Sequence, residues 1–224
     1  MNLYNLHTDS NKLIGGDKQM EIPVLAYKQL TGINSSFLGE DDKITLLKTI
    51  AKDAEYSYLY AQDVLEGRFA QGEQAIATSA KYSLKYAENI LDDRFELGEE
   101  AISKSAIASV NYATDVLEGR FELGENAISK DASASTDYAS NIIEGRFELG
   151  ENAISTSASE SFYYAKYVIE GRWEQGEDAI STSARYIFYY AKDIIKSRFV
   201  KGEEQIKKND YAWDRYTKLF LKDR

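Results

Sequence analysis

Small and apolar residues recur through most of the chain at the spacing of one helix face. Between residues 106 and 117 they recur three or four positions apart. An α-helix turns once in 3.6 residues, so this spacing predicts an amphipathic helix, whereas a half-buried strand would alternate. The positions are Ala106, Ser109, Val110, Ala113, Val116 and Leu117.

The same helical pattern returns every 26 residues. The sequence YATDVLEGRFELGENAI, which begins at Tyr112, is one of six closely similar copies, and a partial seventh copy ends the chain. We call a set of equivalent positions, each 26 residues from the next, a column. The tyrosine column is Tyr60, Tyr86, Tyr112, Tyr138, Tyr164, Tyr190 and Tyr216, and the arginine column ends at Arg224. Because the period never slips, the sequence predicts a stack of like modules.

Each repeat is predicted to hold two helices, helix A and helix B. Side chains that cap free backbone N–H groups mark the start of helix A at Asp53, Ser79, Ser105, Asp131, Ser157, Ser183 and Asn209. Glycine marks its predicted end about 14 residues later, because glycine adopts a left-handed backbone at little cost. These end positions are Gly67, Gly119, Gly145 and Gly171, with Asp93 and Ser197 as substitutes. The remainder leaves room for a helix B of about eight residues.

A helix as short as helix B does not persist alone in water, so it must pack on its neighbours. A second glycine column lies inside helix B, where each glycine costs about 0.5–1 kcal/mol relative to alanine, and we infer close backbone contact there. This column is Gly72, Gly98, Gly124, Gly150, Gly176 and Gly202.

The predicted fold is all-α, an αα-solenoid of six 26-residue two-helix repeats with capping segments at both ends. We expect residues 1–41 to form an irregular N-terminal cap with one helix that begins near Pro23. The repeat array is expected over residues 42–208, and a C-terminal capping helix over residues 209–224.

The composition of the chain disfavours some classes of function. The chain has no cysteine and a net charge of −10, which disfavours thiol chemistry and direct nucleic-acid binding. The charge is uneven, with −4 over residues 1–78, −11 over residues 79–182 and +5 over residues 183–224. The first ten residues contain no basic region followed by an apolar run, and no apolar stretch approaches the roughly 18 residues of a membrane span. We therefore expect a cytoplasmic protein that makes no contact with membranes.

No combination of side chains predicts catalysis. The only histidine, His7, stands without cysteine or paired carboxylates at ligand spacing, and no phosphate-binding glycine motif occurs. We expect no enzymatic activity, no cofactor and no metal site.

The arginine column and a glutamate column are identical in every full copy. The residues of an active site would instead differ from the repeat pattern at one place. Each glutamate follows its arginine by five residues, which favours a structural ladder of Arg–Glu contacts that joins helices or neighbouring repeats. The alternative, a row of arginines that tracks a polyanion, is opposed by the net charge. The ladder consists of Arg68, Arg94, Arg120, Arg146, Arg172 and Arg198 with Glu73, Glu99, Glu125, Glu151, Glu177 and Glu203.

The positions of helix A that vary between repeats share one face, the columns of positions 56, 59 and 63. The concave side of a solenoid is where ligands usually lie, so this helix A face is the candidate binding surface. One column is a row of short polar side chains, interrupted by Tyr167: Asp63, Asn89, Asp115, Asn141 and Asp193. Such a row either hydrogen-bonds the backbone of an extended partner or is a solvated stripe, and both interpretations stay open.

Toward the C-terminus the same face becomes aromatic, with Tyr163, Tyr167, Tyr186 and Tyr189. Tyrosine is enriched at protein interfaces because it contributes contact area at low entropic cost. We expect Phe162 and Phe188 to point into the core instead. The four tyrosines are the candidate recognition patch; alternatively, bulky side chains thicken the last repeats and close the open end.

The unit YAxxVLEGRF followed by GExAI, preceded by LYNLHTDSNKLIGGDKQMEIPVLAY, resembles uncharacterised short αα-repeat proteins encoded by large tailed bacteriophages. The resemblance covers nearly the whole chain. Relatives of this type often carry tryptophan and proline where this chain has Phe-Glu, Phe-Ala or Trp-Glu, so the start of helix B is less firmly set here. The resemblance implies a phage accessory protein that binds and blocks a host factor, and it carries over no catalytic residue.

The sequence therefore leads to the hypothesis of a non-catalytic protein that binds a protein partner, either a host factor or itself, through the helix A face. One alternative is an assembly protein that self-associates through its acidic middle and basic end. A second alternative is an acidic mimic of nucleic acid that occupies a DNA-binding protein.

Overall fold

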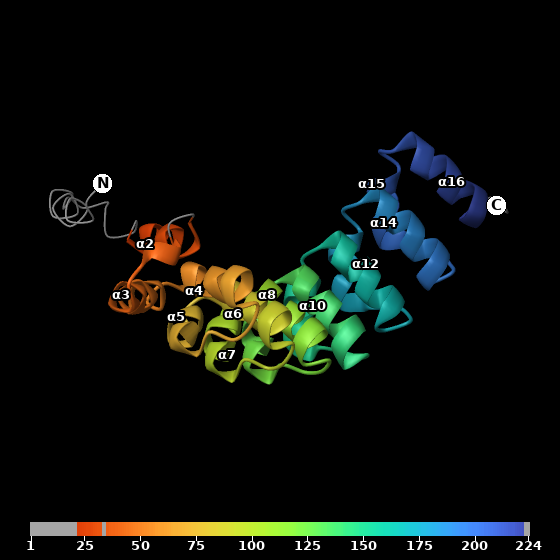
Figure 1. Cartoon of the computed structure of the whole chain (residues 1–224). Helices are drawn as coiled ribbons and strands as arrows, with labels where there is room; N and C mark the ends of the chain where they lie inside the picture. The colour runs from red at the N-terminus through yellow and green to blue at the C-terminus, as the bar shows by residue number, and fades with distance from the viewer. Residues whose placement is uncertain (1–21, 33–34, 222–224) are drawn as a thin grey trace. The chain divides into compact units, whose positions relative to one another are not determined.

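The computed structural model describes residues 22–32 and 35–221 of the chain. All regular elements in these ranges are helical and follow the 26-residue pattern of an α-solenoid (Figure 1), so the predicted all-α fold is confirmed. The chain divides into two compact halves, an N-terminal half, Met1–Ala101, and a C-terminal half, Ile102–Arg224. The predictions for His7 and Arg224 lie outside the described residues.

Two helices precede the first repeat. The first, α2 (Ile22–Thr31), has Pro23 in its first turn, where the missing N–H of proline leaves no hydrogen bond unmade, as predicted. A 3-10 turn, η2 (Ser35–Phe37), leads to α3 (Glu40–Ile50). These helices pack against each other.

Helix A of each repeat is a short α segment, which in all but one repeat continues into a wider π-helical turn. The segments are α4 (Ala54–Tyr60) with η3 (Ala61–Leu65), α6 (Ala80–Tyr86) with η5 (Ala87–Leu91), α8 (Ala106–Asn111) with η7 (Tyr112–Val116), α10 (Ala132–Tyr138) with η9 (Ala139–Ile143), α12 (Ala158–Tyr167), and α14 (Ala184–Tyr189) with η12 (Tyr190–Ile194). The partial seventh copy adds α16 (Asp210–Phe220).

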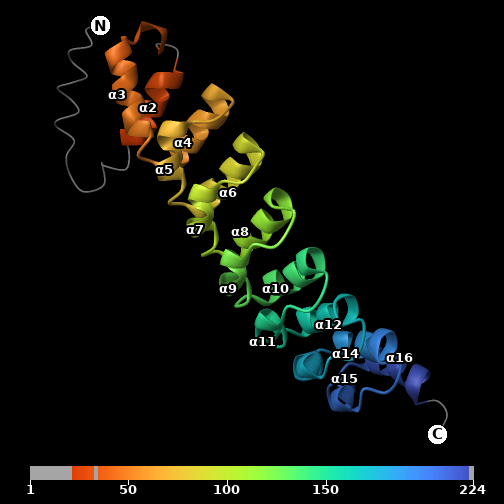
Figure 2. The same ribbon diagram turned by 90° about the horizontal axis from the view of Figure 1, so that it is seen from below.

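Helix B is a 3-10 turn followed by one α-helical turn. The pairs are η4 (Ala70–Gly72) with α5 (Glu73–Ile76), η6 (Glu96–Gly98) with α7 (Glu99–Ile102), η8 (Glu122–Gly124) with α9 (Glu125–Ile128), η10 (Glu148–Gly150) with α11 (Glu151–Ile154), η11 (Glu174–Gly176) with α13 (Glu177–Ile180), and η13 (Val200–Gly202) with α15 (Glu203–Ile206). Within each half, helices A line one side and helices B the other (Figure 2).

Helix A begins where the capping column predicts. The residue before each first turn has an extended backbone in all seven copies. In five copies its side chain accepts a hydrogen bond from a backbone N–H three residues later, which satisfies a donor that the helix leaves free. Ser79 and Ser183 hold the same position without this bond.

The predicted end of helix A is wrong by one residue. The left-handed residue is not the glycine but the residue before it: Glu66, Asp92, Glu118, Glu144, Glu170 and Lys196. Gly119 instead closes the turn, because its N–H donates to the carbonyl of Ala113, six residues earlier, at 3.0 Å. Asp93 and Ser197 therefore fill positions that do not need glycine.

The glycine column inside helix B lies in close contact with helix A, as predicted. A Cβ atom on Gly150 would lie 2.5 Å from Oγ of Ser135 and 2.6 Å from Cδ1 of Phe147. Ser135 is completely buried, and its hydroxyl donates to the carbonyl of Ile128 in the preceding repeat at 2.8 Å. Glycine thus allows helix B to approach a serine that links two repeats.

Each arginine of the ladder contacts the glutamate five residues later, inside its own repeat. In repeat 4, Nε and Nη2 of Arg146 donate to the two carboxylate oxygens of Glu151 at 2.8 and 2.9 Å. The glutamate side chain is only 8% exposed, whereas that of Arg146 is 56% exposed. The pair therefore joins the loop after helix A to helix B, and its carboxylate belongs to the core.

Contact between neighbouring repeats is made by the tyrosine column. The hydroxyl of Tyr164 donates to Glu151 at 2.8 Å and accepts the N–H of Phe147 at 3.0 Å, and both of these residues belong to the preceding repeat. Tyr164 has no exposed surface. The same two bonds recur at Tyr86, Tyr138, Tyr190 and Tyr216. A chain of guanidinium, carboxylate, phenol and amide, exposed at the guanidinium and buried at the carboxylate and the phenol, thus links successive repeats.

We expect alkali to unfold this array between pH 10 and about pH 12. Burial, with the neighbouring glutamate, raises the pKa of Tyr86, Tyr164, Tyr190 and Tyr216 from 10.0 to about 12. Above pH 10 the unfolded chain has lost phenolic protons that the folded chain still holds, so the free energy of unfolding falls as pH rises. Absorbance at 295 nm and circular dichroism at 222 nm, followed during one titration, should change together in this window.

A matched titration in 6 M urea should show tyrosine ionisation near pH 10, because the unfolded chain has no buried phenols. Complete ionisation near pH 10 in water, with the helical signal intact, would contradict the burial of this column.

Candidate protein-binding surface

Three of the four predicted tyrosines come together on the helix A face of the C-terminal half. Tyr163 and Tyr167 lie one turn apart on α12, with ring centroids 6.2 Å apart and planes inclined by 16°. The ring of Tyr186, on α14, meets that of Tyr163 edge to face at 6.3 Å. Tyr163 is 36% exposed and Tyr167 is 58% exposed, so this face presents aromatic surface to solvent.

The tyrosines rest on a buried phenylalanine. The ring of Phe162 lies 5.6 Å from Tyr186 and 6.3 Å from the fourth tyrosine, Tyr189. Phe162 and Phe188 are buried in the core, as predicted, and Phe188 also supports Tyr189 at 5.5 Å. We call Tyr163, Tyr167, Tyr186 and Tyr189 the tyrosine patch.

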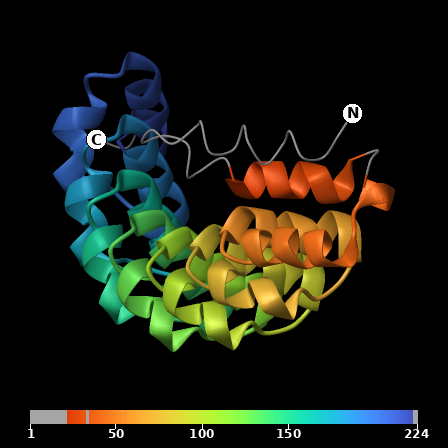
Figure 3. The same cartoon turned by 60° about the vertical axis from the view of Figure 1, so that its left-hand side comes forward.

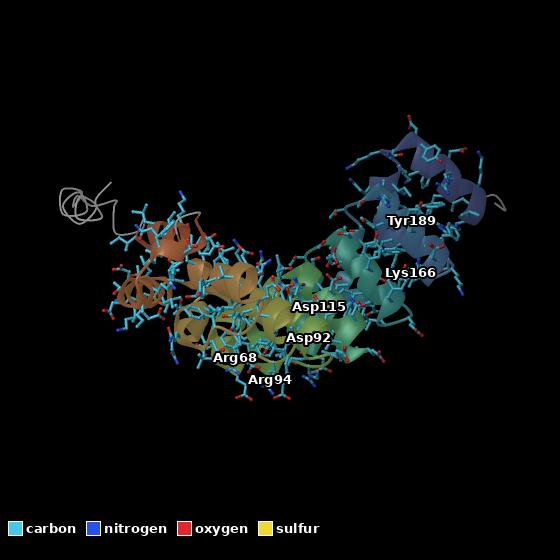
Figure 4. All side chains as sticks on the ribbon, viewed as in Figure 1. Arg68, Asp92, Arg94, Asp115, Lys166 and Tyr189 are labelled. Atoms are coloured by element: carbon cyan, nitrogen blue, oxygen red, sulfur yellow. The ribbon has the colours of Figure 1, made fainter. Side chains whose placement is uncertain are left out.

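Cations that the sequence analysis missed flank this patch. The ammonium group of Lys166 lies 5.0 Å from the ring centroid of Tyr167, and the guanidinium of Arg185 lies 5.6 Å from that of Tyr186. Arg215, on α16, lies 4.4 Å above the ring of Phe188. None of the three forms an ion pair within the described part of the chain. Figure 4 shows Lys166 and Tyr189 on successive helices A.

One sequence signal would have identified part of this cationic rim. The column next to the short polar row reads Gln62, Glu88, Thr114, Ser140, Lys166, Lys192 and Lys218. It therefore becomes basic in the last three copies, and in the first two of these the column of position 59 holds Tyr163 and Tyr189.

The short polar row is not one continuous free stripe. Asp63 accepts a hydrogen bond from the hydroxyl of Tyr27 at 2.8 Å, and Asn89 donates to the hydroxyl of Tyr58 at 3.4 Å. Burial and the bond to Asp63 raise the pKa of Tyr27 to about 12. Asp115 and Asn141 are exposed, and Asp193 lies 3.7 Å from the ammonium of Lys192. Where this row has a partner on another helix, that partner is a tyrosine hydroxyl.

No group of three histidine, aspartate or glutamate side chains in the described ranges is placed to hold a metal ion. None of the helices from residue 22 to residue 221 that the structure describes has the length and apolarity of a membrane span. An open depression in the C-terminal half, beside α9, is lined by Lys104, Leu123, Lys130 and Asp131, among others.

The fold and this surface define an α-helical solenoid protein with an aromatic, cation-flanked patch on its helix A face. No family model, curated protein or solved structure matches the chain.

Proposed function

We propose that this chain is a non-catalytic protein-binding module that holds a protein partner on its helix A face. The observation that carries the proposal is the tyrosine patch, an exposed aromatic surface built on two adjacent helices and supported by Phe162. Tyrosine and arginine are enriched among residues that dominate binding energy. Rings already ordered by packing lose little further entropy when a partner binds, which favours affinity.

The alternative, that these tyrosines only cover the open C-terminal end of the array, explains their positions poorly. Tyr163 and Tyr167 belong to repeat 5, and repeat 6 and α16 follow it in the chain. The end of the array instead carries Tyr211 and Leu219, which are 73% and 53% exposed. Residues needed only to cover the last repeat would lie on α16.

The finer part of the proposal rests on the resemblance to bacteriophage repeat proteins. We propose an accessory protein of a bacteriophage that acts in the host cytoplasm and inhibits or sequesters a host factor. Affinity capture from a bacterial lysate, followed by mass spectrometry, is the experiment that would identify that factor.

Replacing Tyr163 and Tyr189 together with alanine should weaken binding of the captured partner by at least about 100-fold, because each anchor of this kind contributes about 2 kcal/mol or more. Biolayer interferometry with the purified partner measures the loss. The melting temperature should change little for Tyr163, which is exposed, and modestly for Tyr189, which is half-buried.

The matched control is Leu123→Ala, which removes an apolar side chain that is 52% exposed on the helix B side. It should leave binding unchanged. Equal losses for the control and the tyrosine variant, or a collapse of the melt with Tyr163→Ala alone, would refute binding through this face.

The uneven charge supports a second candidate, self-association. Residues 79–182 carry −11 and residues 183–224 carry +5, so the acidic middle of one copy attracts the basic end of another. Sedimentation velocity at 20 mM and 500 mM salt tests this candidate. A strict monomer at both concentrations rules it out, whereas salt-sensitive dimers support it.

A further inference from the structure

Two rings of the tyrosine patch are already used by the packing of the array, and two present their surface to solvent. Tyr186 and Tyr189 are half-buried, and both rings pack on Phe162 of α12, the preceding helix A. Tyr163 and Tyr167 are exposed on α12. A ligand of this face therefore finds its apolar contact mainly on the two exposed rings.

The helices that carry the patch and its flanking cations stand in a row. Helix α12 contacts α14, and α14 contacts α16, at the cyan-to-blue end of the chain in Figure 3. Packed helices lie about 8–10 Å apart, so the face from α12 to α16 is about 16–20 Å long. An extended chain rises about 3.3 Å per residue, so about six residues are enough to cross this face.

Cations that form no ion pair with a described residue gather along this row. Lys166, Arg185 and Arg215 belong to α12, α14 and α16, and each lies over an aromatic ring. A cation in this position is held by the ring and keeps hydrogen-bond donors for a ligand. Other lysines of the last two copies pair with carboxylates: Lys192, Lys201, Lys207 and Lys218. The three ring-bound cations are therefore available to an anionic ligand.

The column of position 59 changes its charge along the same row. In the C-terminal half it reads Asn111, Asp137, Tyr163, Tyr189 and Arg215. Asp137 is exposed, so a carboxylate stands on the repeat 4 side of the tyrosines and a guanidinium on the α16 side. A ligand that carries carboxylates is therefore attracted when these lie toward α14 and α16, and repelled when they lie toward repeat 4.

We propose that this row binds an acidic segment of a partner protein, extended over about six residues. An apolar side chain of the segment packs on Tyr163 and Tyr167. Carboxylates that follow it along the row pair with Lys166, Arg185 and Arg215. The inference rests on the proposed function and names the chemistry of its partner. The net charge of −10 does not oppose this contact, because charges more than about 8 Å away are screened at physiological salt, whereas the three cations touch the ligand.

A nucleic-acid strand also presents anions and flat rings, but this surface suits it less well. Phosphates follow one another along the whole strand, so those that pass the patch toward repeat 4 would meet Asp137. Residues 79–182 carry a net charge of −11, which repels them further. An acidic segment of a protein has its carboxylates at one end only, which matches the change of charge along the row.

A display library of linear 12-residue peptides tests the chemistry of the segment. It is selected with the full chain at about 150 mM salt and counter-selected with the Tyr163→Ala/Tyr167→Ala variant. Enriched clones should share an aromatic or aliphatic residue with at least two aspartates or glutamates on one side of it.

Charge reversal with the best clone tests the pairing. Lys166→Glu should raise the Kd at least about tenfold, because an attraction is replaced by a repulsion. Changing one acidic residue of the clone to lysine should bring the Kd on Lys166→Glu back to within about threefold of the original value. The matched control is Lys130→Glu, which makes the same change of net charge at an exposed lysine beside α9 and should change the Kd less than about twofold.

The outcomes separate this inference from the proposed function. Clones that require Tyr163 and Tyr167 but are neutral or basic would overturn the inference alone. Equal losses for Lys166→Glu and Lys130→Glu, or no recovery with any lysine-bearing clone, would do the same. The absence of clones that require the two tyrosines would overturn both. Tighter binding of fluorescein-labelled dT20 than of any clone, lost in the tyrosine variant, would also overturn both in favour of nucleic acid.

Discussion

Tyr164→Phe is expected to lower the free energy of unfolding by about 2–3 kcal/mol, although it removes a single oxygen atom. That hydroxyl is completely buried, accepts the N–H of Phe147 and donates to Glu151. Phenylalanine leaves the amide without its acceptor and the carboxylate without one of its donors. Unsatisfied groups inside a protein cost more than the lost bond itself contributes, which is the reason for the large effect.

Urea denaturation followed by circular dichroism measures the change. Amide hydrogen exchange adds a local test, because the N–H of Phe147 should exchange faster in the variant by more than its neighbours do. Tyr60→Phe is the matched control. It lies in the same column, but its hydroxyl has no hydrogen bond with any described residue, so it should cost less than about 0.5 kcal/mol. Equal losses at the two positions would show that the phenol bonds do not couple the repeats.

The same arrangement explains why the Arg–Glu ladder is more than a row of surface ion pairs. The carboxylate of Glu151 accepts from Nε and Nη2 of Arg146 and from the hydroxyl of Tyr164. Two of these donors lie in its own repeat and one in the next. The sequence predicted that arginine and glutamate meet, because both columns are identical in every copy. It did not indicate that the tyrosine column completes the contact, since a repeated tyrosine is equally typical of simple core packing.

The sequence predicts the first residue of helix A correctly but not its last residue. Its starts were predicted correctly because capping is a side-chain property, and the side chains of Asp53 and Asp131 are visible in the sequence. Its ends were misplaced because the backbone decides which of two successive residues becomes left-handed. The carbonyl of Tyr112 bonds the N–H of Leu117, five residues later, and this wide turn makes Glu118 left-handed before the chain reaches Gly119.

The tyrosine patch was predicted only in part. Its tyrosines stood out because they break the repeat, but their grouping around Phe162 depends on how α12 and α14 pack. The flanking cations were missed because Lys166, Arg185 and Arg215 occupy three different columns. The short polar row was predicted to face an extended partner or solvent. The tyrosine hydroxyls that Asp63 and Asn89 contact come from residues 31 or more positions away, a distance at which sequence periodicity gives no pairing.

Gly150→Ala should be among the most destabilising single changes in the array, at about 3 kcal/mol. The added methyl group would lie 2.5 Å from Oγ of Ser135 and 2.6 Å from the ring of Phe147, both of which are buried. Overpacking of this kind costs about 1–3 kcal/mol. Moving Ser135 also weakens its hydrogen bond to Ile128, which adds about 1 kcal/mol because the carbonyl is left without this donor.

Gly145→Ala is the control, since it adds the same methyl group five residues earlier. Its Cβ would lie 3.9 Å from the nearest neighbouring atom, an ordinary contact, and its backbone is not left-handed. Alanine there should be neutral or stabilise the chain by up to about 1 kcal/mol, because it restricts the unfolded chain. Thermal melts of the two variants should therefore move in opposite directions, or differ by about 10 °C. Equal melting temperatures would mean that helix B does not depend on close approach to Ser135, and the glycine column would then need another cause.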